Sequence, residues 1–230
     1  MNYSFGYLVG SLALILVWII IFFWRKDVRK EMILISLIFG ALGPFLSPIF
    51  LSDWWRPPTI TGTPVGVEDF LFGFAVGGIG SVIYMEIFHK KLRLKKPTKK
   101  KEKKRNIRFG LLFGLGALAF FILYLLGLHS FPASIIAATL AITIIWIQRP
   151  DLILDSLISG ILLTLVSLIF YILPEFLFPG WINYTWNFNS LTGITFLKAP
   201  IEDLVWFFFS GMLVGPTYEY WKEGKIINQK

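Results

Sequence analysis

Long apolar runs, separated by short polar or charged segments, recur along this chain. Seven of them are between 17 and 22 residues long, the length that an α-helix needs to cross roughly 30 Å of hydrocarbon. Because lipid cannot satisfy exposed backbone groups, each run is expected to be helical. The sequence therefore predicts an all-α, polytopic membrane bundle of seven transmembrane helices, at Phe5–Trp24, Met32–Leu51, Asp69–Phe88, Phe109–Leu128, Phe131–Ile147, Leu152–Leu173 and Ile201–Trp221.

Composition agrees with this class, and charge gives an orientation. Hydrophobic residues make up 56% of the 230 residues, above the 45–50% that is usual in soluble domains. The segment from His89 to Arg108 holds twelve basic residues and the acid Glu102, a charge of +11, so the rest of the +8 chain totals −3. The positive-inside rule predicts a multi-pass cell-membrane protein whose N-terminus is outside and whose C-terminus is cytoplasmic. The 89–108 loop is expected to contact anionic lipid headgroups, and no nucleic-acid partner is expected.

The sequence also indicates an internal duplication. The segment Arg29–Gly40 parallels Arg149–Gly160, and the pair Glu68-Asp69 parallels Glu202-Asp203. The pattern predicts a first three-helix repeat over 1–90, a polybasic loop plus linker helix over 91–130, and a second three-helix repeat over 131–230. Repeats joined by one extra helix share their orientation, as in other parallel repeats.

Two acidic pairs are the most informative chemical feature. Glu68-Asp69 and Glu202-Asp203 each stand at the outer end of a predicted helix, where that helix begins. Acidic residues stabilise helix N-termini and are common among lipid headgroups. Ionisable groups at membrane depth more often face the bundle interior, where a carboxylic acid kept neutral can donate a proton. The register of the two pairs favours four convergent, candidate catalytic carboxyls.

Aromatic and polar residues gather in the outer loops near these acids. Interfacial Trp and Tyr belts are one explanation, and a pocket whose ring faces stabilise a carbocation is the other. The candidate substrate-binding residues are Trp54, Trp55, Arg56, Tyr184, Trp186 and Trp206.

Other residue types suggest packing rather than chemistry. The small-xxx-small pairs Gly73/Gly77, Gly110/Gly114 and Gly211/Gly215 predict close helix packing. Glu86 and Glu219 lie near cytoplasmic helix ends and are expected to meet headgroups. The chain has no cysteine, and its two histidines stand in unrelated places, so no metal site is expected.

The shape Pro-x-Glu-(Glu/Asp) at the start of an aromatic-rich helix, present twice, resembles the lycopene cyclase domain family in its fused form. It stands here as Pro200-Ile-Glu202-Asp203 and Gly66-Val-Glu68-Asp69, with Gly66 in place of proline and aspartate in place of the more usual second glutamate. The resemblance implies a cofactor-free, redox-neutral isomerase. Such an enzyme closes a β-ionone ring on a linear carotenoid through a protonated, carbocationic end group. It also implies Glu68 and Glu202 as proton donor and base, positioned by Asp69 and Asp203.

Other classes remain open from the residues. A membrane prenyltransferase acts on a related isoprenoid but needs Asp-rich motifs for magnesium and diphosphate, and no such run is present. A retinal protein needs a lysine inside its last helix, whereas Lys198 and Lys222 stand at the ends of this one. A transporter or isoprenoid-binding protein would use helix breaks, for which Gly43-Pro44 and Gly215-Pro216 are the candidates. The oligomeric state does not follow from the sequence.

Overall fold

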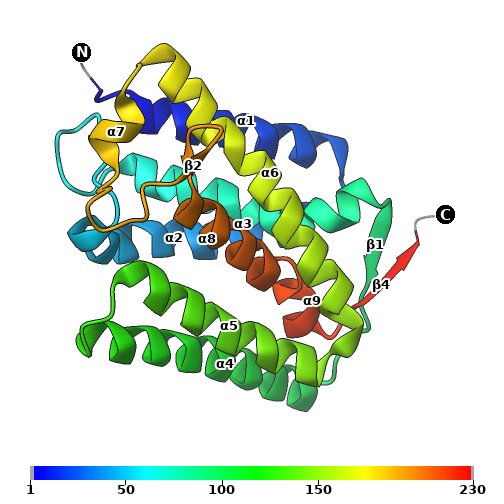
Figure 1. The fold of residues 1–230 in the computed structure, drawn as a ribbon. Helices are drawn as coiled ribbons and strands as arrows, with labels where there is room; N and C mark the ends of the chain where they lie inside the picture. The colour runs from blue at the N-terminus through cyan, green and yellow to red at the C-terminus, as the bar shows by residue number, and fades with distance from the viewer. Residues whose placement is uncertain (1–2, 229–230) are drawn as a thin grey trace.

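The computed structural model describes residues 3–228, which form an all-α bundle with two small β-ribbons (Figure 1). Six of its helices are long and apolar enough to cross a membrane, and they correspond in order to the first six predicted ones. They are α1 (Gly6–Trp24), α2 (Arg29–Asp53), α3 (Val67–Ile87), α4 (Lys99–Leu125), α5 (Ser130–Gln148) and α6 (Ile153–Leu177), the last preceded by the 3-10 turn η1 (Pro150–Leu152).

The seventh predicted helix is not continuous. It is divided into α8 (Ile201–Val214) and α9 (Thr217–Lys222) at Gly215-Pro216. Proline lacks the backbone N–H of a helical bond and disfavours the helical conformation of the residue before it. Gly43-Pro44, the other predicted break, stays inside the continuous helix α2. A seventh helix of spanning length is therefore not confirmed.

The basic segment is more ordered than a loop. Its first part forms strand β1 (Lys90–Arg93), which pairs antiparallel with β4 (Lys225–Asn228) and ties the C-terminal segment to the end of α3. Its second part is already helical, because α4 begins at Lys99 after the N-cap Thr98. The remaining short elements lie at the opposite end of the bundle and are α7 (Trp181–Thr185), β2 (Thr195–Phe196) and β3 (Ala199–Pro200).

The helices pack as two closely matched pairs with a hairpin beside them. Helix α2 packs along α3 and α6 packs along α8, while α1 lies against both α3 and α6. Helices α4 and α5 form an antiparallel hairpin, drawn in green in Figure 1, that contacts the rest of the bundle mainly through α5 and α8.

Glycines set how closely the paired helices approach. A Cβ added at Gly73 would lie 2.4 Å from the Phe39 carbonyl oxygen of α2, and one added at Gly211 would lie 2.6 Å from the Ser159 carbonyl oxygen of α6. Such contacts require glycine, so the prediction of close packing is confirmed at these two helix pairs. It is wrong for Gly110 and Gly114, where an added Cβ would meet nothing within 4 Å.

A buried arginine fastens the turn between α1 and α2 to the end of α3. The Arg25 guanidinium donates to both carboxylate oxygens of Asp27 at 2.9 Å, to Glu86 Oε2 at 3.1 Å and to the Met85 carbonyl oxygen at 3.1 Å. These hydrogen bonds from Arg25 hold the pKa of Asp27 below its ordinary value. The basic end of the bundle, meaning this turn together with β1 and β4, thus has a fixed polar framework.

Candidate active site

Both acidic pairs lie in first helical turns at the end of the bundle opposite β1 and β4. Glu68 and Asp69 open α3, and Glu202 and Asp203 open α8. All four side chains are buried, with at most 7% of each residue exposed. We call this end the carboxyl end. The expectation that four carboxyls lie at equivalent helix starts matches their placement, and their catalytic roles stay a prediction.

Asp69 lies among three helices of the first half. Its Oδ1 accepts hydrogen bonds from the Ser47 hydroxyl of α2 at 2.8 Å and from the Tyr7 hydroxyl of α1 at 3.2 Å. Its Oδ2 accepts the Gly66 backbone N–H at 2.8 Å, which also caps the start of α3. Hydroxyl groups both donate and accept, so two of the three partners of Asp69 adapt to either protonation state of the carboxyl group.

Asp203 has three side-chain donors. Its Oδ1 accepts the indole N–H of Trp54 at 2.7 Å, and its Oδ2 accepts the indole N–H of Trp186 and the hydroxyl of Tyr171, each at 2.8 Å. An indole N–H only donates. Each oxygen of Asp203 therefore faces one partner that cannot accept a hydrogen bond.

The two glutamates are held differently from the aspartates and alike to each other. Glu68 Oε1 accepts the Ile60 N–H at 2.7 Å, and Glu202 Oε1 accepts the Thr192 N–H at 2.6 Å. In both residues Oε2 is buried and has no hydrogen-bond partner among the described residues. Each glutamate thus anchors the preceding loop with one oxygen and keeps the other oxygen unpaired.

A cavity of about 540 Å³ joins the two halves of the site. Asp69 and Asp203 lie on its wall, whereas Glu68 and Glu202 do not. Aromatic rings surround the aspartates, with ring centroids of Trp54 and Trp206 at 6.3 Å and of Phe72 and Trp206 at 6.1 Å. The aromatic residues that line this end of the cavity are Tyr7, Phe50, Trp54, Trp55, Phe72, Phe170, Tyr171, Trp206 and Phe207.

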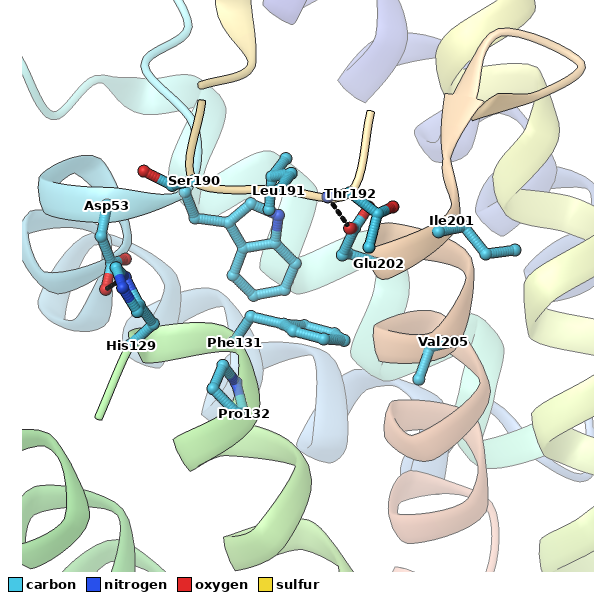
Figure 2. Close-up of a pocket in the computed structure, with 11 residues that line it drawn as sticks. Asp53, His129, Phe131, Pro132, Ser190, Leu191, Thr192, Ile201, Glu202 and Val205 are labelled. Atoms are coloured by element: carbon cyan, nitrogen blue, oxygen red, sulfur yellow. Dashed lines mark hydrogen bonds and ion pairs between the residues drawn. The ribbon is translucent and has the colours of Figure 1, made fainter. Parts of the chain in front are cut away.

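A second pocket, of about 460 Å³, opens at the carboxyl end beside α5 and α8, and we call it the outer pocket (Figure 2). Glu202 lines it, and Figure 2 shows the bond from Thr192 that holds this side chain. Asp53 and His129 lie on the same pocket, 3.4 Å apart between Oδ2 and Nδ1. Trp54 lines both the outer pocket and the cavity, so its indole separates Glu202 from the chamber that contains Asp203.

The six residues predicted as substrate-binding divide into two groups. Trp54, Trp55 and Trp206 line the cavity. Trp186 donates to Asp203 and packs against Trp55 in a tilted arrangement, with ring centroids 5.7 Å apart. The other two lie away from the cavity. Arg56 donates to the carbonyl oxygens of Leu51 and Ser52 at the end of α2, and Tyr184 is 63% exposed.

Sequence reasoning missed the hydroxyl partners of the two aspartates. Tyr7, Ser47 and Tyr171 lie in apolar helices, where a hydroxyl needs a partner. The same helices carry other hydroxyl residues, such as Ser36, Thr164 and Ser167, so this signal alone does not single the three out. Sequence reasoning also misplaced Glu219, which is fully buried rather than among headgroups. Within residues 3–228, no group of three or more His, Asp or Glu side chains has an arrangement that could hold a metal ion.

Fold and site together define a class: a helical, membrane-type protein with two buried aspartates on the wall of an aromatic cavity. A sequence model described as lycopene cyclase matches residues 5–88 and 129–221, more than half of the chain, so the protein belongs to the lycopene cyclase family. The matched segments contain both acidic pairs, and the unmatched residues 89–128 comprise β1 and α4. No curated protein and no solved structure matches the chain.

Proposed function

We propose that this protein is a lycopene cyclase-type membrane enzyme that closes a six-membered ring on the end group of a linear carotenoid. The observation that carries the proposal is the cavity, in which two buried aspartates face an aromatic, apolar chamber. A carotenoid end group has no charge or polar handle. Binding of such a substrate therefore relies on apolar and aromatic surface, with acids placed only where the reaction occurs.

The chemistry is a proton transfer at each end of a carbocation. One carboxylic acid protonates the terminal double bond of the end group and leaves a tertiary cation. The neighbouring double bond attacks that cation and closes the ring, and a carboxylate then removes a proton from the ring. One proton is added and one is lost, so the product is an isomer of the substrate and no electrons are exchanged.

The geometry suggests how the four carboxyls divide this work. Asp69 and Asp203 face the substrate, one as acid and the other as base, and the faces of Trp55, Phe72 and Trp206 stabilise the cation between the two steps. This differs from the expectation that the glutamates act directly, because only the aspartates line the cavity. Glu202, which lines the outer pocket and keeps one buried oxygen unpaired, exchanges protons between water and the neighbourhood of Asp203.

The architecture that we propose around this site is the duplicated one, with repeats over 1–90 and 131–230 and a connecting segment over 91–130. Helices α8 and α9 together make a broken seventh crossing, so the carboxyl end faces outside and the basic end faces the cytoplasm. There the basic residues of 89–108 contact anionic lipid headgroups. The substrate is an isoprenoid of the carotenoid type, and no nucleic acid takes part.

The test is expression in a bacterial host that accumulates lycopene, followed by chromatography and mass measurement of the pigments. We expect γ- and β-carotene at unchanged mass, and one deuterium gained per ring when the reaction runs in heavy water. Replacing Glu202 by glutamine keeps an oxygen for the Thr192 N–H and removes the exchangeable proton, so conversion is expected to fall at least 10²-fold, in the range of a lost proton-transfer group.

The matched control is Glu219→Gln, which removes a buried carboxyl at the basic end, far from the reaction, and is expected to leave conversion unchanged. Lycopene recovered without change from membranes that contain folded wild-type protein would refute the proposal. Magnesium-dependent turnover of a prenyl diphosphate would replace it with the prenyltransferase function.

A further inference from the structure

The cavity is elongated along the helix axes. Its lining on α2 runs from Phe39 to Trp54, fifteen positions that correspond to about 22 Å at 1.5 Å per residue. On α8 it runs from Asp203 to Val214, which corresponds to about 16 Å. The acids stand at one end of this length, and the lining beyond them is almost entirely apolar. The cavity is therefore a groove for an extended apolar chain, with its reactive groups at the carboxyl end.

Helix α4 forms a wall of this groove. Phe113, Gly114, Ala117 and Phe121 line it from α4, as Phe39, Leu42 and Phe45 do from α2. Three lining residues are classed as exposed, namely Gly114 and Ala117 on α4 and Phe45 on α2, which is 68% exposed, so the cavity is open at these residues. A groove whose lining reaches the lipid-facing surface on both walls opens sideways, between α2 and α4.

Small residues make room at this opening. A Cβ added at Gly114 would meet nothing within 4 Å, so no neighbouring helix fills the space beside it. Helix α4 belongs to the segment that lies outside both parts of the family match. The wall that it contributes is thus a property of this chain beyond the matched core.

The length of the substrate exceeds that of the groove. An extended chain advances about 1.2 Å per bond, so a linear carotenoid with roughly thirty backbone bonds is ~36 Å long, against about 22 Å of groove. Only one end group can reach Asp69 and Asp203 at a time. The rest of the chain has to leave the bundle, and the opening between α2 and α4 leads to the lipid in which such a chain dissolves.

We propose that α4 forms one side of a lateral opening through which the substrate enters the groove. A linear carotenoid enters from the bilayer between α2 and α4, end group first, and keeps its other half in that opening while one ring closes. This inference rests on the proposed function for the identity of the substrate. It adds the route, the residues that form it, and the consequence that each binding event cyclises a single end.

The test compares Gly114→Phe with Gly110→Phe in detergent-solubilised protein. Both glycines are exposed on α4 one turn apart, both have open space around an added Cβ, and only Gly114 lines the groove. The new Cβ meets nothing within 4 Å at either position, and each change replaces a helix-weakening glycine, so both variants are expected to fold. Lycopene binding is measured by quenching of the tryptophan fluorescence, to which Trp54, Trp55 and Trp206 on the cavity wall contribute, and conversion is measured by chromatography.

We expect Gly114→Phe to raise the lycopene concentration for half-maximal quenching at least tenfold and to slow conversion, while Gly110→Phe matches the wild type. Equal lycopene binding by the two variants, or wild-type tryptophan fluorescence that lycopene does not quench, would refute the proposed entry route. If the wild type binds lycopene but converts none, the proposed function fails, and the difference in binding between the two variants still decides the route.

A time course tests the single-end consequence separately. Released monocyclic γ-carotene should exceed the enzyme concentration before bicyclic β-carotene accumulates, because the chain has to leave and return in the opposite direction for the second ring. Bicyclic product formed from the first turnovers, with no free monocyclic intermediate, would contradict insertion from one end.

Discussion

The two aspartates of the cavity should differ in how much stability they lose on the same small change, replacement by asparagine. At Asp203 both carboxylate oxygens accept an indole N–H, Oδ1 from Trp54 and Oδ2 from Trp186. An asparagine presents one oxygen and one NH₂ group, so either orientation places its NH₂ against an indole that can only donate. At Asp69 the NH₂ can instead face the hydroxyls of Tyr7 and Ser47, which accept, while the oxygen keeps the Gly66 N–H.

The size of the expected difference follows from the indole N–H that asparagine at position 203 leaves without an acceptor. A buried donor left without a partner costs about 1–3 kcal/mol, and the Trp54 and Asp203 side chains are both buried, at 6% and 7% exposed. Asp203→Asn is therefore expected to lower the free energy of unfolding by about 1–3 kcal/mol more than Asp69→Asn does. Reversible unfolding in mixed detergent micelles, followed by circular dichroism, measures the difference for the two variants side by side.

A double-mutant cycle tests the cause. Trp186→Phe removes the donor that faces Oδ2, so asparagine at 203 can turn its NH₂ towards the vacated side and keep its oxygen for Trp54. Trp186→Phe should therefore lower the free energy of unfolding by less in the Asp203→Asn variant than in the wild type, with a coupling energy of about 1 kcal/mol or more. Equal losses for Asp69→Asn and Asp203→Asn, or strictly additive effects in the cycle, would refute this account of the site.

Two further predictions concern the framework of the bundle. Gly211→Val places a Cβ 2.6 Å from the Ser159 carbonyl oxygen, so α6 and α8 must separate, and the free energy of unfolding is expected to fall by about 1–3 kcal/mol. The control Gly110→Val, whose Cβ meets nothing within 4 Å, should lower it by less than half as much. Equal losses for the two variants would contradict the close packing of α6 on α8. The Arg25 hydrogen bonds lower the pKa of Asp27 from 3.8, so their contribution to stability is complete above about pH 4 and is lost as the pH falls through the lower, folded value. Asp27→Asn should therefore flatten the acid side of a thermal-unfolding profile, and an unchanged slope would show that the pair contributes nothing.

The candidate site could be found from the sequence, but its orientation could not. Two Glu-Asp pairs at equivalent helix starts were visible as residues, together with Trp54, Trp55 and Trp206. Successive residues on a helix point about 100° apart, so the sequence could not tell which member of each pair faces the cavity. The rotation of α3 and α8, fixed by how each packs on its partner helix, places the aspartates on the cavity wall and the glutamates against the loops.

The sequence by itself determined the class of this protein and most of its helices, because the length of an apolar run and the need to satisfy backbone groups in lipid act locally. It offered Gly43-Pro44 and Gly215-Pro216 alike as candidate breaks, and only the second interrupts a helix. The tertiary structure decided what local pattern leaves undetermined. Gly73/Gly77 and Gly110/Gly114 have the same spacing, yet only the first pair meets a helix. The second pair lies free on the outside of α4 because α4 packs on α5 through another face, and that free face leaves the groove open to the bilayer.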